Sequence, residues 1–187
     1  MPDTINRQLA GKMKEMNFAV FVPPREFKDE SLSSVRMFLE KWGVQYKIAS
    51  YGNSNCTGYH GSICRKDVDA LKINPADYDG IIIVDGLGID STRLYEFRPL
   101  LDMVMLFNSA GRKIVAMGNA VKILARANII KNRRVSVRDP EAKRLVTLFH
   151  GVPTEEPIEI SDGLITIDSQ ADMEGSMKKM LSSLGII

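Results

Sequence analysis

Reactive side chains are scarce in this chain of 187 residues, which has only two cysteines, two histidines and one tryptophan. Two cysteines cannot supply the disulfide framework that staples small extracellular scaffolds. A metal site built from several Cys and His ligands is disfavoured for the same reason. An enzyme that pairs a nucleophile with a histidine base would have to use His60 or His150.

Long apolar runs are also missing, because runs such as residues 81–84 and 103–107 cover only four or five residues. A membrane helix needs about 18 apolar residues. No apolar stretch follows the basic residues of the N-terminus, as it would in a signal peptide. We therefore expect a cytoplasmic protein that does not contact a membrane. Its 44% hydrophobic and 26% charged residues are ordinary for a globular domain and exclude disorder.

The small net charge of +2 conceals an uneven distribution along the chain. Residues 112–144 contain ten Lys and Arg but two Asp and Glu, whereas residues 145–187 contain two Lys and seven Asp and Glu. A basic segment can attract nucleic acid. Here the basic residues alternate with apolar ones, as on a solvated helix face, so nucleic-acid binding is disfavoured.

The hydrophobic pattern predicts alternating strands and helices between residues 18 and 128. Gly43 and Gly111 would end two of the helices, and Pro99 suits the first turn of the second. Such alternation is typical of a parallel sheet with helices on both faces. The predicted strands cover residues 18–22, 44–49, 80–84 and 113–117, and the predicted helices cover 29–42, 99–110 and 119–128.

The two ends of the chain add shorter elements. Residues 1–16 have the spacing of an amphipathic helical extension, which would precede a single domain of residues 17–187. Residues 51–61 are predicted to form a loop because they are rich in Gly, Asn and Ser. Further strands are predicted at 134–137, 145–149, 158–160 and 164–167, with a hairpin turn at Asp162-Gly163 and a last helix at 173–184.

Two strand ends carry a recognisable pattern. Residues 77–86 read DYDGIIIVDG and resemble the "YDaliiPGG" strand and loop of the ThiJ/PfpI superfamily, and residues 109–120 read SAGRKIVAMGNA and resemble its nucleophile elbow. The resemblance extends over about residues 17–184. It implies a flavodoxin-like, doubly wound α/β sandwich that associates as a homodimer.

The departures from that pattern concern the residues that carry the family's chemistry. The elbow cysteine of the family corresponds to Gly118, and the histidine that often follows it corresponds to Asn119. The glutamate on the first helix corresponds to Ser31, with Glu30 next to it. Because covalent acyl chemistry needs a nucleophile, the resemblance implies a catalytically inactive member, a pseudoenzyme without a cofactor.

Backbone groups would survive these losses. Amides near Gly86-Leu87 and Asn119-Ala120, above Gly118, could still bind a small anionic or carbonyl-containing ligand, and the surface could bind a protein partner. A cysteine placed at position 118 would then be unusually reactive. The alternative is a tight turn filled by neighbouring side chains.

A rival hypothesis is a hydrolase, glyoxalase or amidotransferase that uses relocated residues. Ser31, Glu30, Asp85 and His150 are the candidates, and Asp85, Glu30 and Asp90 could form an acidic cluster.

One weak metal pattern remains in the predicted loop. Cys56, His60 and Cys64 have the spacing C-x3-H-x3-C, but a structural zinc site normally takes a fourth ligand. We therefore interpret these residues as a pair of loop residues and a half-buried thiol.

Overall fold

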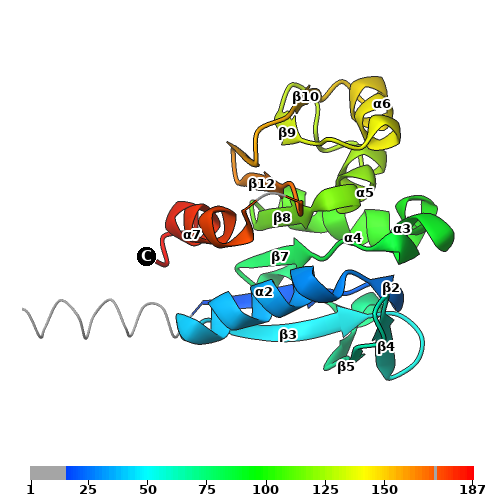
Figure 1. Cartoon of the computed structure of the whole chain (residues 1–187), viewed down its shortest axis with the longest axis vertical. Helices are drawn as coiled ribbons and strands as arrows, with labels where there is room; N and C mark the ends of the chain where they lie inside the picture. The colour runs from blue at the N-terminus through cyan, green and yellow to red at the C-terminus, as the bar shows by residue number, and fades with distance from the viewer. Residues whose placement is uncertain (1–15, 171) are drawn as a thin grey trace, which may run out of the picture.

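A seven-stranded sheet forms the centre of the computed structural model, which describes residues 16–170 and 172–187 (Figure 1). Neighbouring strands pair in parallel except for the last two strands along the chain, which form an antiparallel hairpin at one edge of the sheet. The order across the sheet is β11 (Ile158–Ser161), β12 (Leu164–Ile167), β8 (Lys113–Met117), β7 (Gly80–Ile83), β1 (Asn17–Phe21), β3 (Gln45–Ser50) and β6 (Val68–Asp69).

Helices cover both faces of this sheet. The helices α2 (Asp29–Lys41) and α7 (Met173–Ser183) pack on one face, and α4 (Arg98–Ser109), α5 (Val121–Arg126) and α6 (Pro140–Leu148) lie on the other side. Alternate residues of β1 divide between the two hydrophobic cores, with Phe18 and Val20 in one and Ala19 and Phe21 in the other. The predicted doubly wound α/β fold is therefore confirmed.

Two small sheets, one short α-helix and four short 3-10 helices complete the described part of the fold, the last being η1 (Ala70–Lys72), η2 (Pro75–Asp77), η3 (Leu94–Glu96) and η4 (Gly118–Ala120). One sheet joins β2 (Arg25–Phe27), β4 (Asn55–Gly58) and β5 (Ile63–Arg65), and the other joins β9 (Arg134–Ser136) and β10 (Val152–Thr154). The helix α3 (Leu87–Ser91) directly follows Gly86. The prediction of an uninterrupted loop over residues 51–61 was wrong, because β4 pairs there with both β2 and β5.

The strand predicted at residues 145–149 was also wrong, because these residues belong to α6 and the turn after it. The side chain of Asp139 accepts a hydrogen bond from the amide of Ala142 at 2.8 Å, and Pro140 occupies the first turn. These two residues start a helix. The apolar residues beyond them follow its period. The helix predicted at residues 1–16 lies almost entirely outside the described residues.

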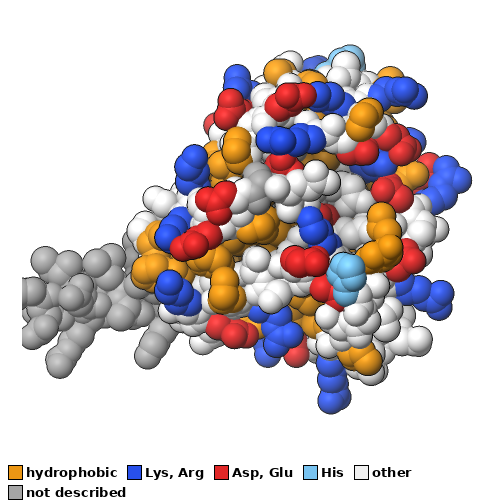
Figure 2. Space-filling view, in the orientation of Figure 1, with side chains coloured by type: hydrophobic (Ala, Val, Ile, Leu, Met, Phe, Trp, Pro, Cys, Tyr) orange, Lys and Arg blue, Asp and Glu red, His pale blue; other side chains and the backbone are white. Residues whose placement is uncertain are grey.

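Ion pairs join the basic segment to the acidic end of the chain. Arg134 and Lys143 lie 2.9 Å and 2.8 Å from Glu159 and Glu155, and Arg138 pairs with Asp168. Figure 2 shows basic and acidic side chains interleaved on this face. The charges of the two segments therefore compensate each other. No helix among the described residues has the length and apolarity needed to cross a membrane.

Candidate functional site

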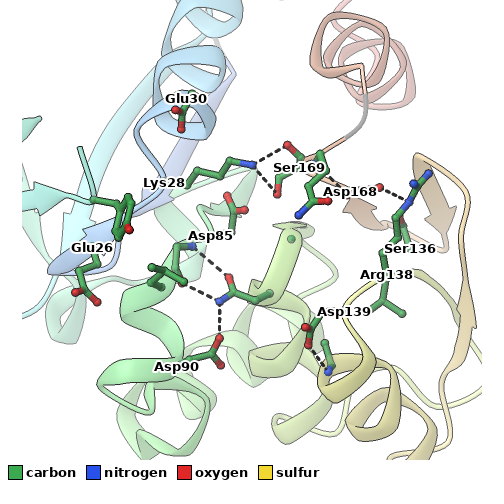
Figure 3. Close-up of a pocket in the computed structure, with 18 of the residues that line it drawn as sticks. Glu26, Lys28, Glu30, Asp85, Asp90, Ser136, Arg138, Asp139, Asp168 and Ser169 are labelled. Atoms are coloured by element: carbon green, nitrogen blue, oxygen red, sulfur yellow. Dashed lines mark hydrogen bonds and ion pairs between the residues drawn. The ribbon is translucent and has the colours of Figure 1, made fainter. Parts of the chain in front are cut away.

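The main pocket lies beyond the carboxyl ends of the strands, which is where open α/β sheets bind ligands. It has a volume of about 520 Å³. Its lining comes from the segments that follow β7, β8, β9 and β12, from the start of α2 with the residues before it, and from the turn between β4 and β5. Figure 3 shows the side chains of these segments around one common space.

Gly118 forms the floor of the pocket and has the backbone of a sharp strand-to-helix turn. Its φ of +49° lies in the left-handed region, which costs a residue with a Cβ atom about 1–2 kcal/mol. A Cβ atom at this position would lie 2.4 Å from Oδ2 of Asp85 and 2.7 Å from Oγ of Ser169. The turn therefore keeps the shape of an elbow, but two neighbouring oxygen atoms occupy the space in which its side chain would begin.

Asp85 follows β7 and points into the space between Lys28, Ser169 and Gly118 (Figure 3). Its side chain is almost completely buried, with the residue only 4% exposed. The Oδ1 atom has no hydrogen-bond partner among the described residues. The backbone amide of Lys28 donates to the carbonyl of Asp85 at 2.8 Å, so the residue is held by its main chain.

Lys28 and Ser169 connect opposite sides of the pocket. The Nζ atom of Lys28 donates to the carbonyl oxygen of Ser169 at 2.8 Å and to its hydroxyl at 3.3 Å. Ser169 follows β12, whereas Lys28 precedes α2, so the contact joins segments 141 positions apart in the chain. This contact holds the Ser169 hydroxyl above the elbow.

Asn119 fastens the elbow to the neighbouring loop. Its amide group donates to the carbonyl of Gly86 at 2.8 Å and to Asp90 at 3.0 Å, and its oxygen accepts from the Gly86 amide at 3.1 Å. Asp90 also accepts from the buried ammonium group of Lys122 at 2.7 Å. The predicted donor at Gly86 is therefore already used within the protein.

Glu30 and His60 lie at the rim of the pocket. The Nε2 atom of His60 is 3.5 Å from Oε1 of Glu30. The turn that carries His60 is anchored by Asp29, which accepts from the amides of His60 at 2.8 Å and of Ser62 at 3.2 Å. Burial alone would raise the pKa of Asp29, but these hydrogen bonds and one from the Ser62 hydroxyl outweigh it and lower that pKa.

Most of the predicted binding residues are brought together. Gly86, Leu87, Gly118 and Asn119 all line the pocket, but Ala120 is buried in the core and does not. The three carboxyl groups proposed as an acidic cluster also reach it: Asp85, Asp90 and Glu30.

Two of the predicted substitute residues do not reach the pocket. Ser31 is 1% exposed and is not part of the lining, because the neighbouring Glu30 takes the pocket side of α2. His150 is exposed in the turn after α6 and lies outside the lining. Neither residue can therefore act on a ligand in this pocket.

The cysteines are likewise separate from the pocket. Cys56 and Cys64 face each other across the antiparallel pair of β4 and β5, both buried and unbonded. Burial raises the pKa of both thiols. Among the described residues no group of three or more Cys, His, Asp or Glu is placed to hold a metal ion.

The charge of the lining differs from the sequence-based expectation. Six carboxyl groups face two basic side chains, those of Lys28 and Arg138, and one histidine. An excess of carboxyl groups repels anions. The anionic ligand predicted from the backbone amides is therefore a poor match for this pocket. The six carboxyl groups of the lining are those of Glu26, Glu30, Asp85, Asp90, Asp139 and Asp168.

Sequence reasoning did not single out Lys28, Ser169 or Arg138 as site residues. Ser169 and its neighbours follow β12, and their position at a strand end was an available signal. Lys28 and Arg138 reach the pocket from segments outside the central sheet. Whether the side chains of Lys28 and Arg138 reach the pocket depends on how those segments pack against the central sheet.

Comparisons with known proteins agree on one family. The sequence model of the DJ-1/PfpI family matches residues 17–182. An uncharacterized protein of Methanocaldococcus jannaschii is 25% identical over 158 residues, which cover 84% of this chain and 77% of that protein. The deglycase PfpI of Pyrococcus furiosus is 24% identical over 124 residues, or 64% of this chain and 74% of the relative.

Solved structures agree with the fold. A ThiJ/PfpI domain protein from Brachyspira murdochii superposes with a TM-score of 0.80 at 18% identity, covering 91% of this chain and 95% of the other. Drosophila melanogaster DJ-1beta superposes with a TM-score of 0.78 at 16% identity, covering 92% and 91%.

Proposed function

Since the chain belongs to the DJ-1/PfpI family, we propose that it is a member that binds a small ligand non-covalently and has no reaction centred on an elbow cysteine. The pocket is in the size range of small-molecule sites, which is about 300–1,000 Å³. The ligand would be a small molecule held by hydrogen bonds, a carbonyl compound among the possible classes.

The observation that carries this proposal is that residue 118, in the turn after β8, is a glycine. Glycine has no side chain with which to attack a substrate, and covalent catalysis requires such a group. The side chains of Asp85 and Ser169 fill the place where a side chain of residue 118 would begin. The elbow is therefore built around the missing side chain.

The cysteines elsewhere in the chain do not offer a substitute. A thiol reacts as its thiolate, and burial in apolar surroundings opposes ionisation. Cys56 and Cys64 are buried, with raised pKa values, and neither lines the pocket.

The rival proposal is an enzyme that uses other pocket residues. Of the four candidates predicted from the sequence, Asp85 and Glu30 line the pocket. A carboxyl group within reach of a substrate can act as a general acid or base. The experiment must therefore test these two groups.

The test is an assay of methylglyoxal consumption and of deglycation of methylglyoxal-modified amino acids with purified protein. We expect rates at the background of buffer, unchanged by Asp85→Asn, Glu30→Gln or the double replacement Cys56→Ser/Cys64→Ser. Turnover above background that Asp85→Asn or Glu30→Gln abolishes would support the enzyme instead. Turnover lost with the cysteines would refute the proposal directly. Circular dichroism of each variant checks that it is folded.

A further inference from the structure

We propose that the pocket takes a compact organic ammonium compound whose positively charged nitrogen lies beside the carboxyl group of Asp85. This inference rests on the proposed function, because it names the chemical class of the ligand of the same pocket. It starts from a buried carboxyl group that has no ion-pair partner among the described residues.

Asp85 is 4% exposed, and its Oδ1 atom has no hydrogen-bond partner among the described residues. The ion pairs formed within that part of the chain do not include this carboxyl group, since its basic neighbour Lys28 is directed to Ser169. A buried carboxylate is costly unless it is paired and hydrogen-bonded. A ligand that supplies both a positive charge and N–H donors would meet both needs.

The other carboxyl groups of the lining differ from Asp85 because each has a partner within the protein. These partners are Ser91 for Glu26 at 2.9 Å, His60 for Glu30 at 3.5 Å, Lys122 for Asp90 at 2.7 Å, the amide of Ala142 for Asp139 at 2.8 Å, and Arg138 for Asp168. Among the described residues no such partner is found for the side chain of Asp85.

A second polar atom lies beside the other oxygen of the same carboxyl group. The Oγ atom of Ser169 and Oδ2 of Asp85 both approach the space above Gly118, at 2.7 Å and 2.4 Å from the position of a Cβ atom there. An ammonium group has three hydrogens to donate. The Ser169 hydroxyl can accept one of them although it already accepts from Lys28, because a hydroxyl oxygen has two lone pairs. Asp85 and Ser169 thus form two adjacent acceptors.

The size and walls of the pocket favour an organic cation over a bare metal ion. A volume of about 520 Å³ is much larger than one ion requires. Apolar side chains of Leu87, Val137 and Ala142 share the lining with the polar groups. Ca²⁺ and Mg²⁺ take six or more ligands, mainly oxygen atoms, and one carboxyl group with one hydroxyl is too few.

Three probes with the same ring test this inference on the unmodified protein: benzylamine, benzyl alcohol and benzoate. Each is titrated at low salt while the backbone amide signals of Gly86, Gly118 and Ser169 are followed by NMR. We expect benzylamine to shift these signals with an affinity about tenfold or more above that of benzyl alcohol. Benzoate should not shift them.

A matched pair of variants locates the interaction. Asp85→Asn keeps the shape of the side chain and removes its charge, and it should lower the benzylamine affinity by about tenfold or more. Glu30→Gln makes the same chemical change at the exposed rim of the same pocket and should alter the affinity less than twofold, because exposed charges are screened. An equal loss in both variants would show a diffuse acidic field and overturn the assignment to Asp85.

The remaining outcomes also decide the question. Equal binding of benzylamine and benzyl alcohol would overturn the inference. No binding of benzylamine would also overturn it, and this is the result if Lys28 turns to neutralise Asp85 in solution. Binding of benzyl alcohol or benzoate alone would reject the ammonium ligand but leave the non-covalent pocket intact. The proposed function fails by a different measurement, namely turnover that depends on a pocket or cysteine side chain.

Discussion

Gly118→Ala is expected to destabilise the protein by an amount that can be separated into two parts. The φ of +49° accounts for about 1–2 kcal/mol of the free energy of unfolding. The new Cβ atom would lie 2.4 Å from Oδ2 of Asp85 and 2.7 Å from Oγ of Ser169, so both side chains must leave their rotamers, at about 0.5–1.5 kcal/mol each. The expected loss is therefore about 2–5 kcal/mol.

Urea unfolding followed by circular dichroism measures this loss, with Gly111→Ala as the matched control. Gly111 also has a positive φ, +69°, but a Cβ atom there would have no neighbour within 4 Å. Its replacement should show the backbone part alone, about 1–2 kcal/mol. In an Asp85→Ala background the cost of Gly118→Ala should fall by about 0.5–1.5 kcal/mol, since one of the two contacts is gone. Equal costs at positions 118 and 111, or no change in the Asp85→Ala background, would refute the crowded elbow.

Further predictions concern reactivity, charge and assembly. Gly118→Cys should react more slowly with iodoacetamide than the same cysteine combined with Asp85→Ala, because the carboxyl group occupies its space; equal rates would mean that the elbow is open. Lys122→Met should lower the free energy of unfolding in urea by only about 1 kcal/mol, since its partners Asp90 and Glu141 are 41% and 75% exposed and can be solvated. Lys122→Ala should lower it by about 2 kcal/mol more, because the buried stem of the side chain would leave a cavity. Hydrogen bonds from Arg134 lower the pKa of Glu159 below its ordinary value of 4.5. The pair therefore stabilises the folded state fully at pH values above 4.5, and this stabilisation is lost as the pH falls through the lowered pKa. Glu159→Gln should therefore be about 1 kcal/mol less stable than the unmodified protein at pH 7 and equal to it in strong acid; a constant difference would contradict this. The predicted homodimer would give twice the chain mass of 20.9 kDa in light scattering, and a monomer would reject it.

Local sequence signals were sufficient for the elements of the central sheet except β6, a two-residue strand for which no strand was predicted. The boundaries predicted for β8 and β12 are confirmed to the residue, because each is an apolar run with clear turn residues beside it. The turn at Asp162-Gly163 joins β11 to β12 as predicted, with both residues at positive φ. The wrong strand at 145–149 is a short apolar run, for which period alone does not separate strand from helix.

The location of the site was also within reach of the sequence. Asp85-Gly86 and Gly118-Asn119 follow neighbouring parallel strands, so their meeting at one edge of the sheet follows from the topology. That residue 118, in the turn after the strand at 113–117, is a glycine is visible in the sequence.

What occupies that site was decided by tertiary structure. Adjacent residues on a helix differ by about 100° in direction, so the docking of α2 determined that Glu30 reaches the pocket and that Ser31 is buried. The contact of Lys28 with Ser169 spans 141 positions, and no local pattern encodes such a meeting. The scarcity of Cys and His limited the reactive groups that the site could contain. Only the packing of distant segments placed Asp85, which has no ion-pair partner among the described residues, beside Gly118, because burial and pairing depend on every element that closes over the group.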